Sequence, residues 1–104
     1  MAWSENAAQD LEDITRVLAR ESPTTARRLL NRVRAWAATL QRLPHRGRVV
    51  PELREFGIST WRELVARPHR LVYRLEGRTV FIDGLFDARR DLEDLLIERL
   101  LTHP

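Results

Sequence analysis

Over the first part of the chain, apolar residues recur at three- and four-residue spacings, as they do on the buried face of an α-helix. One such stripe predicts a helix over residues 5–21. A second stripe begins after Ser22 and Pro23, which suit a helix start, and it ends at Pro44. Because so short a turn joins the two helices, they must lie antiparallel, and we expect a helical hairpin over residues 5–43.

Further along the chain, apolar and polar positions alternate with a period of two, which is typical of β-strands. Residues 61–65 and 70–75 form two such runs, and Pro68 lies in the turn between them. A third run covers residues 79–86. Strands joined by short turns form an antiparallel meander, which we expect over residues 58–86, with one apolar face to receive the helical hairpin.

The remaining segments complete the expected architecture. Residues 44–57 are loop-like and hold one possible helical turn at 52–55. Asp87 suits the N-cap of a last helix over residues 88–101. The apolar stripe of that helix consists of Leu92, Leu95, Leu96 and Leu100. The sequence therefore predicts one α+β domain over residues 1–104: the helical hairpin packs on one face of a three- to four-stranded antiparallel β-sheet, and a C-terminal helix follows.

The amino-acid composition excludes several kinds of functional site. The chain has no cysteine, which excludes disulfides and thiolate metal ligands and favours an intracellular protein. No apolar run approaches the ~20 residues that span a bilayer, so we expect a soluble, cytoplasmic protein without a membrane partner. His45, His69 and His103 are scattered, and neither a metal site nor a cofactor site is expected.

The charge pattern indicates an acidic partner. All 18 basic residues are arginine, a feature that can equally reflect GC-rich codon usage. Residues 44–90 carry ten arginines against six acids, whereas residues 91–104 carry one arginine against four acids. The positive excess is therefore expected in the sheet region, where a nucleic acid or an acidic polypeptide could bind.

Arginines of the sheet region are the candidate functional residues. Arg62, Arg70 and Arg74 fall on neighbouring strands, and Arg46 and Arg48 lie in the loop that enters the sheet. Grouped on one face, they could grip a phosphate or stabilise charge on a phosphodiester. They could equally belong to a solvated face and pair with nearby acids across the strands. The sequence leaves both interpretations open.

Alternation also assigns faces to other side chains. Tyr73 falls on the apolar side of its strand, so we expect it to be packed, with a partner for its hydroxyl group. Glu63 shares a face with Trp61, and if that face is buried it needs an arginine partner. His69 beside the turn proline is expected to be exposed. Arg89 and Arg90 are expected in the first turn of the last helix, paired with the acids that follow at 93 and 94.

Short strings along nearly the whole chain follow one another in a characteristic order. They are Trp3-Ser4, Ala8, Asp10-Leu11, Leu43-Pro44, Gly47-Arg48, Pro51-Glu52-Leu53, Arg62-Glu63-Leu64, Arg70-Leu71-Val72-Tyr73-Arg74, and Phe86 through Arg89-Arg90-Asp91. In this order and spacing the chain resembles the ParE/RelE superfamily of bacterial type II toxins.

The resemblance implies a compact α+β toxin and a small cognate antitoxin that wraps and neutralises it. Such an antitoxin is ParD-like, with a ribbon-helix-helix or similar DNA-binding domain, and the pair represses its own operon. Leu92 and Leu96 are then candidate binding residues beside the arginines. The full set expected to contact target or antitoxin is Arg46, Arg48, Arg62, Arg70, Arg74, Arg89, Arg90, Leu92 and Leu96.

Two branches of the superfamily imply different activities. The RelE-like branch cleaves mRNA on the ribosome, and Arg62, Arg70 and Arg89 would then be the catalytic candidates. However, Phe86 stands where many of those relatives carry histidine, and no tyrosine follows Tyr73 as a proton-transfer group. The ParE-like branch inhibits DNA gyrase by binding and is favoured here. A third possibility is a non-toxic chain that only binds antitoxin and acts as a co-repressor.

Two structural questions stay open in the sequence. Relatives usually begin with a full strand, whereas only Met1-Ala2 precedes Trp3; either the first strand is very short or the start was placed too late. The leucine stripe at 92–100 could mediate a homodimer, or it could cover its own sheet.

Overall fold

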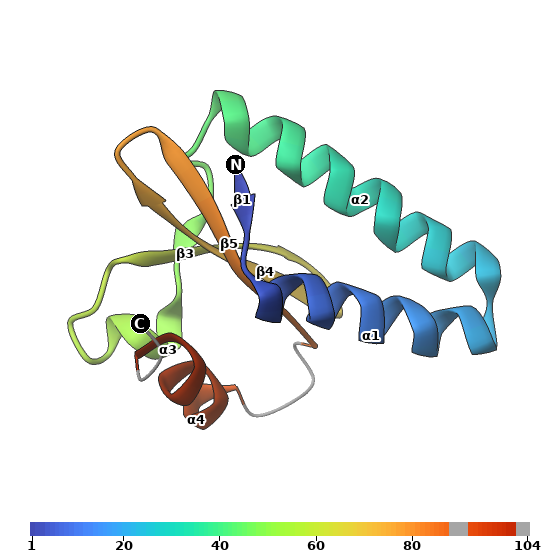
Figure 1. Ribbon diagram of the computed structural model, residues 1–104. Helices are drawn as coiled ribbons and strands as arrows, with labels where there is room; N and C mark the ends of the chain where they lie inside the picture. Colours follow the sequence, from blue (N-terminus) through green and yellow to red (C-terminus); the bar gives the residue numbers. More distant parts are fainter. Residues whose placement is uncertain (88–91, 102–104) are drawn as a thin grey trace.

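A computed structural model describes residues 1–87 and 92–101, and it begins with a helical hairpin (Figure 1). Helices α1 (Glu5–Glu21) and α2 (Pro23–Arg42) are joined at Ser22. The hydroxyl group of Ser22 accepts a hydrogen bond from the amide of Thr25 at 3.3 Å and so caps α2. The expected hairpin is confirmed to within one residue at its end.

The sheet has five strands in the order β1-β5-β4-β3-β2. Their bounds are β1 (Ala2–Trp3), β2 (Arg48–Val49), β3 (Trp61–Ala66), β4 (His69–Glu76) and β5 (Thr79–Asp87). The meander β3-β4-β5 is antiparallel, as expected, and β2 adds to it antiparallel. The other edge strand, β1, pairs with β5 in parallel, so the sheet is mixed. The two edge strands are two residues long, too short for alternation to reveal them in the sequence.

Short helices complete the fold. The turn α3 (Pro51–Arg54) matches the helical turn expected in the long loop. The last helix comprises α4 (Glu93–Leu96) and a π-helical continuation, Ile97–Leu101. The expected cap at Asp87 is wrong, because this residue ends β5 and pairs with His69 in the ladder. The earlier part of the expected helix, residues 88–91, lies outside the described residues. No described helix is long and apolar enough to cross a membrane.

The main core lies between the sheet and the helical hairpin. Leu71 and Tyr73 of β4 point to this side, as the alternation predicts, and both are buried. They meet the inner stripe of α2, which includes Leu29, Trp36 and Leu40. This packing fixes the hairpin against the strands and leaves the outer faces of both helices in solvent.

A second core lies on the opposite face of the sheet, beneath the C-terminal helix (Figure 1). Leu92, Leu96 and Leu100 are buried there. They pack with residues of the sheet and of the segment around α3, namely Val50, Leu53, Val72 and Phe86. The leucine stripe therefore covers its own sheet, which was one of the two expected roles.

Candidate functional site

The candidate arginines do not share one face of the sheet. Arg62 pairs in register with Tyr73, whose side chain points to the helical hairpin. Arg70 and Arg74 lie at alternate positions of β4, on the side of Val72 and the C-terminal helix. The prediction of one arginine face is therefore wrong for Arg62. Leu64 has the same parity as Arg62 and pairs with Leu71, so the register of β3 with β4 turns this side of β3 to the helical hairpin.

Arg70 is held in a buried cluster of carboxylates. Its Nε donates to Glu63 Oε1 at 2.7 Å, and its two terminal nitrogens donate to Glu52 at 2.6 and 2.7 Å. Arg70 is 7% exposed and Glu63 only 1%. The second oxygen of Glu63 accepts a hydrogen bond from Arg48 Nε at 2.7 Å. The predicted arginine partner of Glu63 is thus confirmed, in duplicate.

Pairing shifts the protonation equilibria of this cluster. The hydrogen bonds from Arg70 lower the pKa of Glu52, against the opposing effect of partial burial. The same bonds raise the pKa of Arg70. The guanidinium of Arg70 is consequently a fixed structural cation whose donors are directed at carboxylates of its own chain.

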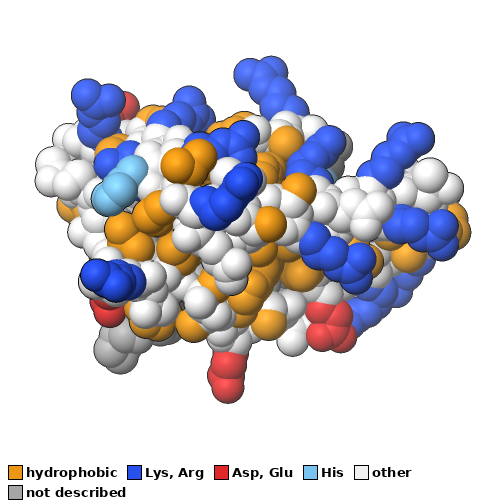
Figure 2. Space-filling model, turned by 90° about the horizontal axis from the view of Figure 1, so that it is seen from above, with side chains coloured by type: hydrophobic (Ala, Val, Ile, Leu, Met, Phe, Trp, Pro, Cys, Tyr) orange, Lys and Arg blue, Asp and Glu red, His pale blue; other side chains and the backbone are white. Residues whose placement is uncertain are grey.

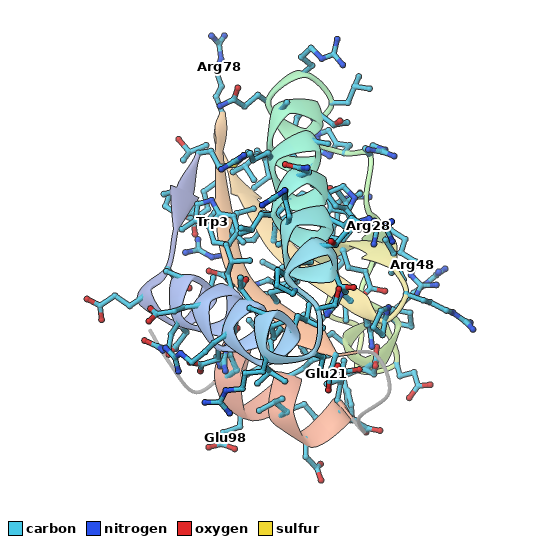
Figure 3. The ribbon with its side chains drawn as sticks, turned by 90° about the vertical axis from the view of Figure 1, so that its right-hand side faces the viewer. Trp3, Glu21, Arg28, Arg48, Arg78 and Glu98 are labelled. Atoms are coloured by element: carbon cyan, nitrogen blue, oxygen red, sulfur yellow. The ribbon has the colours of Figure 1, made fainter. Side chains whose placement is uncertain are left out.

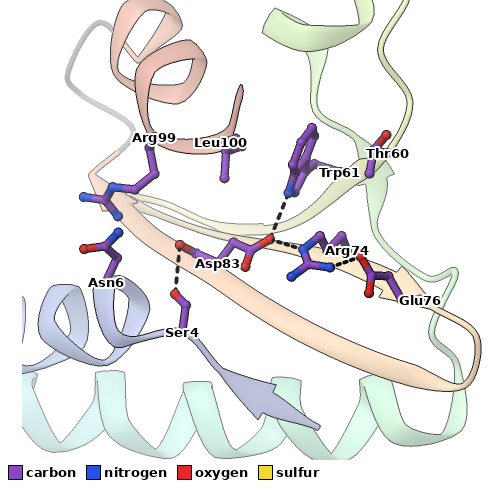
Figure 4. A pocket seen from close by; sticks show the side chains of 9 residues that line it. All are labelled: Ser4, Asn6, Thr60, Trp61, Arg74, Glu76, Asp83, Arg99 and Leu100. Atoms are coloured by element: carbon purple, nitrogen blue, oxygen red, sulfur yellow. Dashed lines mark hydrogen bonds and ion pairs between the residues drawn. The ribbon is translucent and has the colours of Figure 1, made fainter. Parts of the chain in front are cut away.

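A second cluster surrounds Asp83 at the other end of this face (Figure 4). Asp83 Oδ2 accepts hydrogen bonds from Arg74 Nε and from Trp61 Nε1, both at 2.9 Å. Arg74 also pairs with Glu76, and its guanidinium lies 4.4 Å from the centre of the Phe81 ring. Trp61, Arg74, Glu76 and Asp83 line part of a hollow of about 370 Å³ that is open to solvent. Asp83 was not among the predicted site residues, although a charged residue inside an otherwise apolar strand indicates that it has a partner.

The loop that enters the sheet is anchored by Tyr73. Its hydroxyl group accepts a hydrogen bond from the amide of Gly47 at 2.9 Å and donates one to the carbonyl of Pro44 at 2.8 Å. Arg62 Nη1 donates to the carbonyl of Gly47 at 2.8 Å. Burial raises the pKa of Tyr73, so the phenol is neutral at physiological pH and both expected features of Tyr73 are confirmed.

Solvent access separates the other candidates. Arg46 is exposed, and the side chain of Arg48 is 60% exposed although its Nε is paired. Leu92 and Leu96 are buried beneath their own helix, so a partner could reach them only if that helix left the sheet. Arg89, Arg90 and the helix turn expected to hold them lie outside the described residues, as does His103.

The histidines offer no assembled centre in the described part of the chain. His45 is exposed. His69 is buried, so the prediction of an exposed turn residue is wrong: the turn is tighter than expected, and His69 opens β4 opposite Ala66. Among residues 1–87 and 92–101, no three histidine or acidic side chains are grouped so that they could hold a metal ion.

Comparison with protein families gives a match over residues 1–95. The matching family model is described as the ParE toxin of the type II toxin-antitoxin system, parDE. A search of curated proteins found no match.

Proposed function

We propose that this chain, which belongs to the ParE toxin family of type II toxin-antitoxin systems, poisons DNA gyrase by binding to it. Family membership makes the chain a toxin with a cognate antitoxin partner. The proposal adds the molecular target and the mode of action. Harm would come from occupying gyrase and not from breaking a covalent bond in RNA.

The observation that carries this proposal is the enclosure of Arg70 between Glu52 and Glu63. A ribonuclease of this superfamily would need arginines free to stabilise a phosphodiester, with a proton-transfer group beside them. The donors of Arg70 are already occupied by carboxylates, and the phenol of Tyr73 is buried and bonded to the backbone. A binding toxin requires neither group to be free.

The loop between α2 and β2 is the proposed contact surface for gyrase. It exposes Arg46, and Leu43 beside it is 57% exposed; Arg48, at the start of β2, is exposed next to the loop. An exposed leucine flanked by guanidinium groups combines an apolar anchor with charge, a combination found at protein interfaces. Figure 3 shows Arg48 directed away from the body of the molecule. The bonds from Tyr73 and Arg62 hold this loop in place before a partner arrives.

An antitoxin segment has a different place to bind. Between α1 and α2 lies a shallow apolar groove lined in part by Ala8, Leu11, Ala19 and Leu30. An amphipathic helix or extended segment with apolar anchors would fit such a groove. We propose that the ParD-like antitoxin uses it, so that its binding need not compete directly for the gyrase-contacting loop.

A supercoiling assay tests the target. Purified chain should inhibit gyrase at micromolar concentration, and Arg46→Glu should weaken inhibition at least tenfold by reversing charge in the loop. Arg20→Glu is the matched control, because it makes the same change at an exposed position in the last turn of α1. The end of α1 lies at the opposite end of the helical hairpin from the loop (Figure 1), so this variant should leave inhibition unchanged.

Two further measurements distinguish gyrase poisoning from mRNA cleavage and from a co-repressor role. Induced expression should damage DNA before transcripts are cut. Cleaved mRNA in a ribosome-programmed reaction, with supercoiling unaffected, would assign the chain to the ribonuclease branch. Normal growth on expression, together with antitoxin binding, would leave only the co-repressor role.

A further inference from the structure

The outer face of α2 carries five arginines and no acid. They are Arg27, Arg28, Arg32, Arg34 and Arg42. At 100° per residue all five project within an arc of about 160°, opposite the buried stripe that contains Leu29 and Leu40. From the first to the last, the row extends for about 22 Å at 1.5 Å per residue. The helix thus has one apolar face and one face on which every charged residue is basic.

These five guanidinium groups differ from those of the sheet because they lack internal partners. Within residues 1–87 and 92–101, none of them forms an ion pair or a side-chain hydrogen bond. Arg70 and Arg74, in contrast, are both neutralised by acids. Exposed arginines without an acidic partner are therefore concentrated on one face of α2, although counting charges along the sequence places the positive excess in the sheet region. Figure 2 looks down on this side of the molecule and shows many more basic than acidic side chains.

The same face has no apolar anchor. The exposed large hydrophobic side chains of the described residues are Met1, Val17, Leu43, Phe56, Val65 and Leu101. None lies between Pro23 and Arg42; Leu43 caps the C-terminal end of α2 and lies beyond the last arginine of the row. Between the arginines the helix exposes small or polar residues such as Asn31, Ala35 and Ala38. Stable protein interfaces need desolvated apolar or aromatic anchors, so an acidic protein fits this face poorly. A phosphate backbone needs only the charges.

The lack of exposed aromatic side chains on the outer face of α2 favours a double-stranded over a single-stranded nucleic acid. Single strands are held by stacking their bases on aromatic side chains, and the outer face of α2 has none. A duplex instead presents one negative charge for about every 1.7 Å of its axis, so a row of arginines about 22 Å long can reach several phosphates at once. In B-form DNA the major groove is also wide enough to admit a helix, whereas in A-form RNA it is deep and narrow.

We propose that the outer face of α2 binds the phosphate backbone of double-stranded DNA without sequence preference. This activity is separate from the gyrase contact, because it uses a different surface and needs no enzyme. It would keep the toxin on the polymer along which its target also moves. Arginine suits the role, since its planar fork can donate two hydrogen bonds to one phosphate.

The test is a salt titration of binding to a fluorescent 20-base-pair duplex by the full chain alone. Each phosphate contact contributes about −0.9 to the slope of log K against log salt, so five contacts give a slope of about −4.5. The variant Arg27→Gln/Arg32→Gln/Arg34→Gln should bind at least tenfold more weakly and lose about 2.7 of that slope. If it fails to fold, Arg32→Gln alone should lose about 0.9.

The matched control is Arg54→Gln/Arg67→Gln/Arg78→Gln. It removes three exposed arginines outside α2, so both variants lower the formal net charge from +3 to zero. The control should keep most of the affinity and slope. Equal losses in the two variants would show that net charge alone matters and would overturn the proposal. So would a wild-type chain that prefers double-stranded RNA of equal length, or that is displaced more readily by polyglutamate than by unlabelled duplex.

Discussion

Arg70 and Glu63 form a buried ion pair in which both side chains are almost completely removed from solvent, with Nε and Oε1 2.7 Å apart. A buried ion pair stabilises a fold only when the remaining hydrogen-bonding groups of both side chains also have partners. Here Glu52 and Arg48 complete the set from the two neighbouring segments. The cluster joins α3, β2, β3 and β4. This structural role is sufficient to explain the presence of Arg70, and no catalytic function is needed.

Replacing Arg70 should therefore cost stability. Arg70→Met leaves Glu63 buried with only the partly exposed Arg48 as partner, and we expect a loss of about 3–5 kcal/mol in the free energy of unfolding. Urea unfolding followed by tryptophan fluorescence would measure it. Arg46→Met, which removes an exposed and unpaired arginine, should stay within about 0.5 kcal/mol of the parent. A small effect at Arg70 would show that the cluster contributes little and would reopen a ligand role.

The same cluster should make stability depend on acid. The pKa of Glu52 in the folded chain is lowered below its ordinary value of 4.5, which applies to the unfolded chain. The ionised carboxylate therefore stabilises the folded state fully at pH values above 4.5. This stabilisation is lost as the pH falls through the lower pKa of the folded state. The urea midpoint should therefore decline as the pH drops below about 4.5. Glu52→Gln should be less stable at pH 7 and show a shallower decline; an unchanged decline would place the acid sensitivity elsewhere.

Tyr73 allows a direct titration because it is the only tyrosine in the chain. Burial raises the pKa of its phenol above the ordinary value of 10.0. The absorbance change of phenolate should accordingly appear above pH 10 in the native chain and near 10 in urea. The stabilisation is complete below the unfolded pKa and is lost as the pH rises through the folded one. Titration at the same pH in both states would mean that the hydroxyl is accessible to water.

Much of this architecture follows from local pattern. The helix bounds come from apolar spacing and from Ser22 and Pro23, and the burial and pairing of Glu63 follow from its parity with Trp61. Which side chains of neighbouring strands share a face was harder to predict. Parity relates side chains within one strand, but only the register places Arg62 on the face opposite Arg70.

The missed features share a physical origin in tertiary structure. A two-residue strand has no period to detect, so β2 was not predicted, and a very short first strand such as β1 was only one of the two possibilities left open for the N-terminus. Asp83 forms its site by accepting hydrogen bonds from Trp61 and Arg74, which lie on two other strands. These contacts depend on how the strands pair. Conversely, the basic face of α2 could have been found by counting acids within the expected helix instead of within long segments of the chain.

Gly47 should tolerate no side chain. A Cβ placed there would lie 2.7 Å from the carbonyl oxygen of Glu63 and 2.7 Å from the hydroxyl group of Tyr73. Since backbone and a buried ring cannot both move freely, Gly47→Ala should destabilise the chain by about 1–3 kcal/mol. It should also displace the loop that exposes Arg46 and weaken gyrase inhibition beyond the loss of folded protein. Thermal unfolding and supercoiling measured on one preparation would separate the two effects; a fully stable, fully active variant would contradict the anchoring of the loop.

The last helix offers a comparison between two leucines five residues apart. Leu96 is fully buried against Val72 and Phe86, whereas Leu101 is 41% exposed. Leu96→Ala should cost about 2–5 kcal/mol by removing packed methyl groups and leaving a cavity. Leu101→Ala should cost less than half as much, since its side chain already meets water. Chemical denaturation of the two variants decides the matter. If Leu96→Ala weakened partner binding at full stability, the helix would have to leave the sheet when it binds, and the covering role assigned to it would fail.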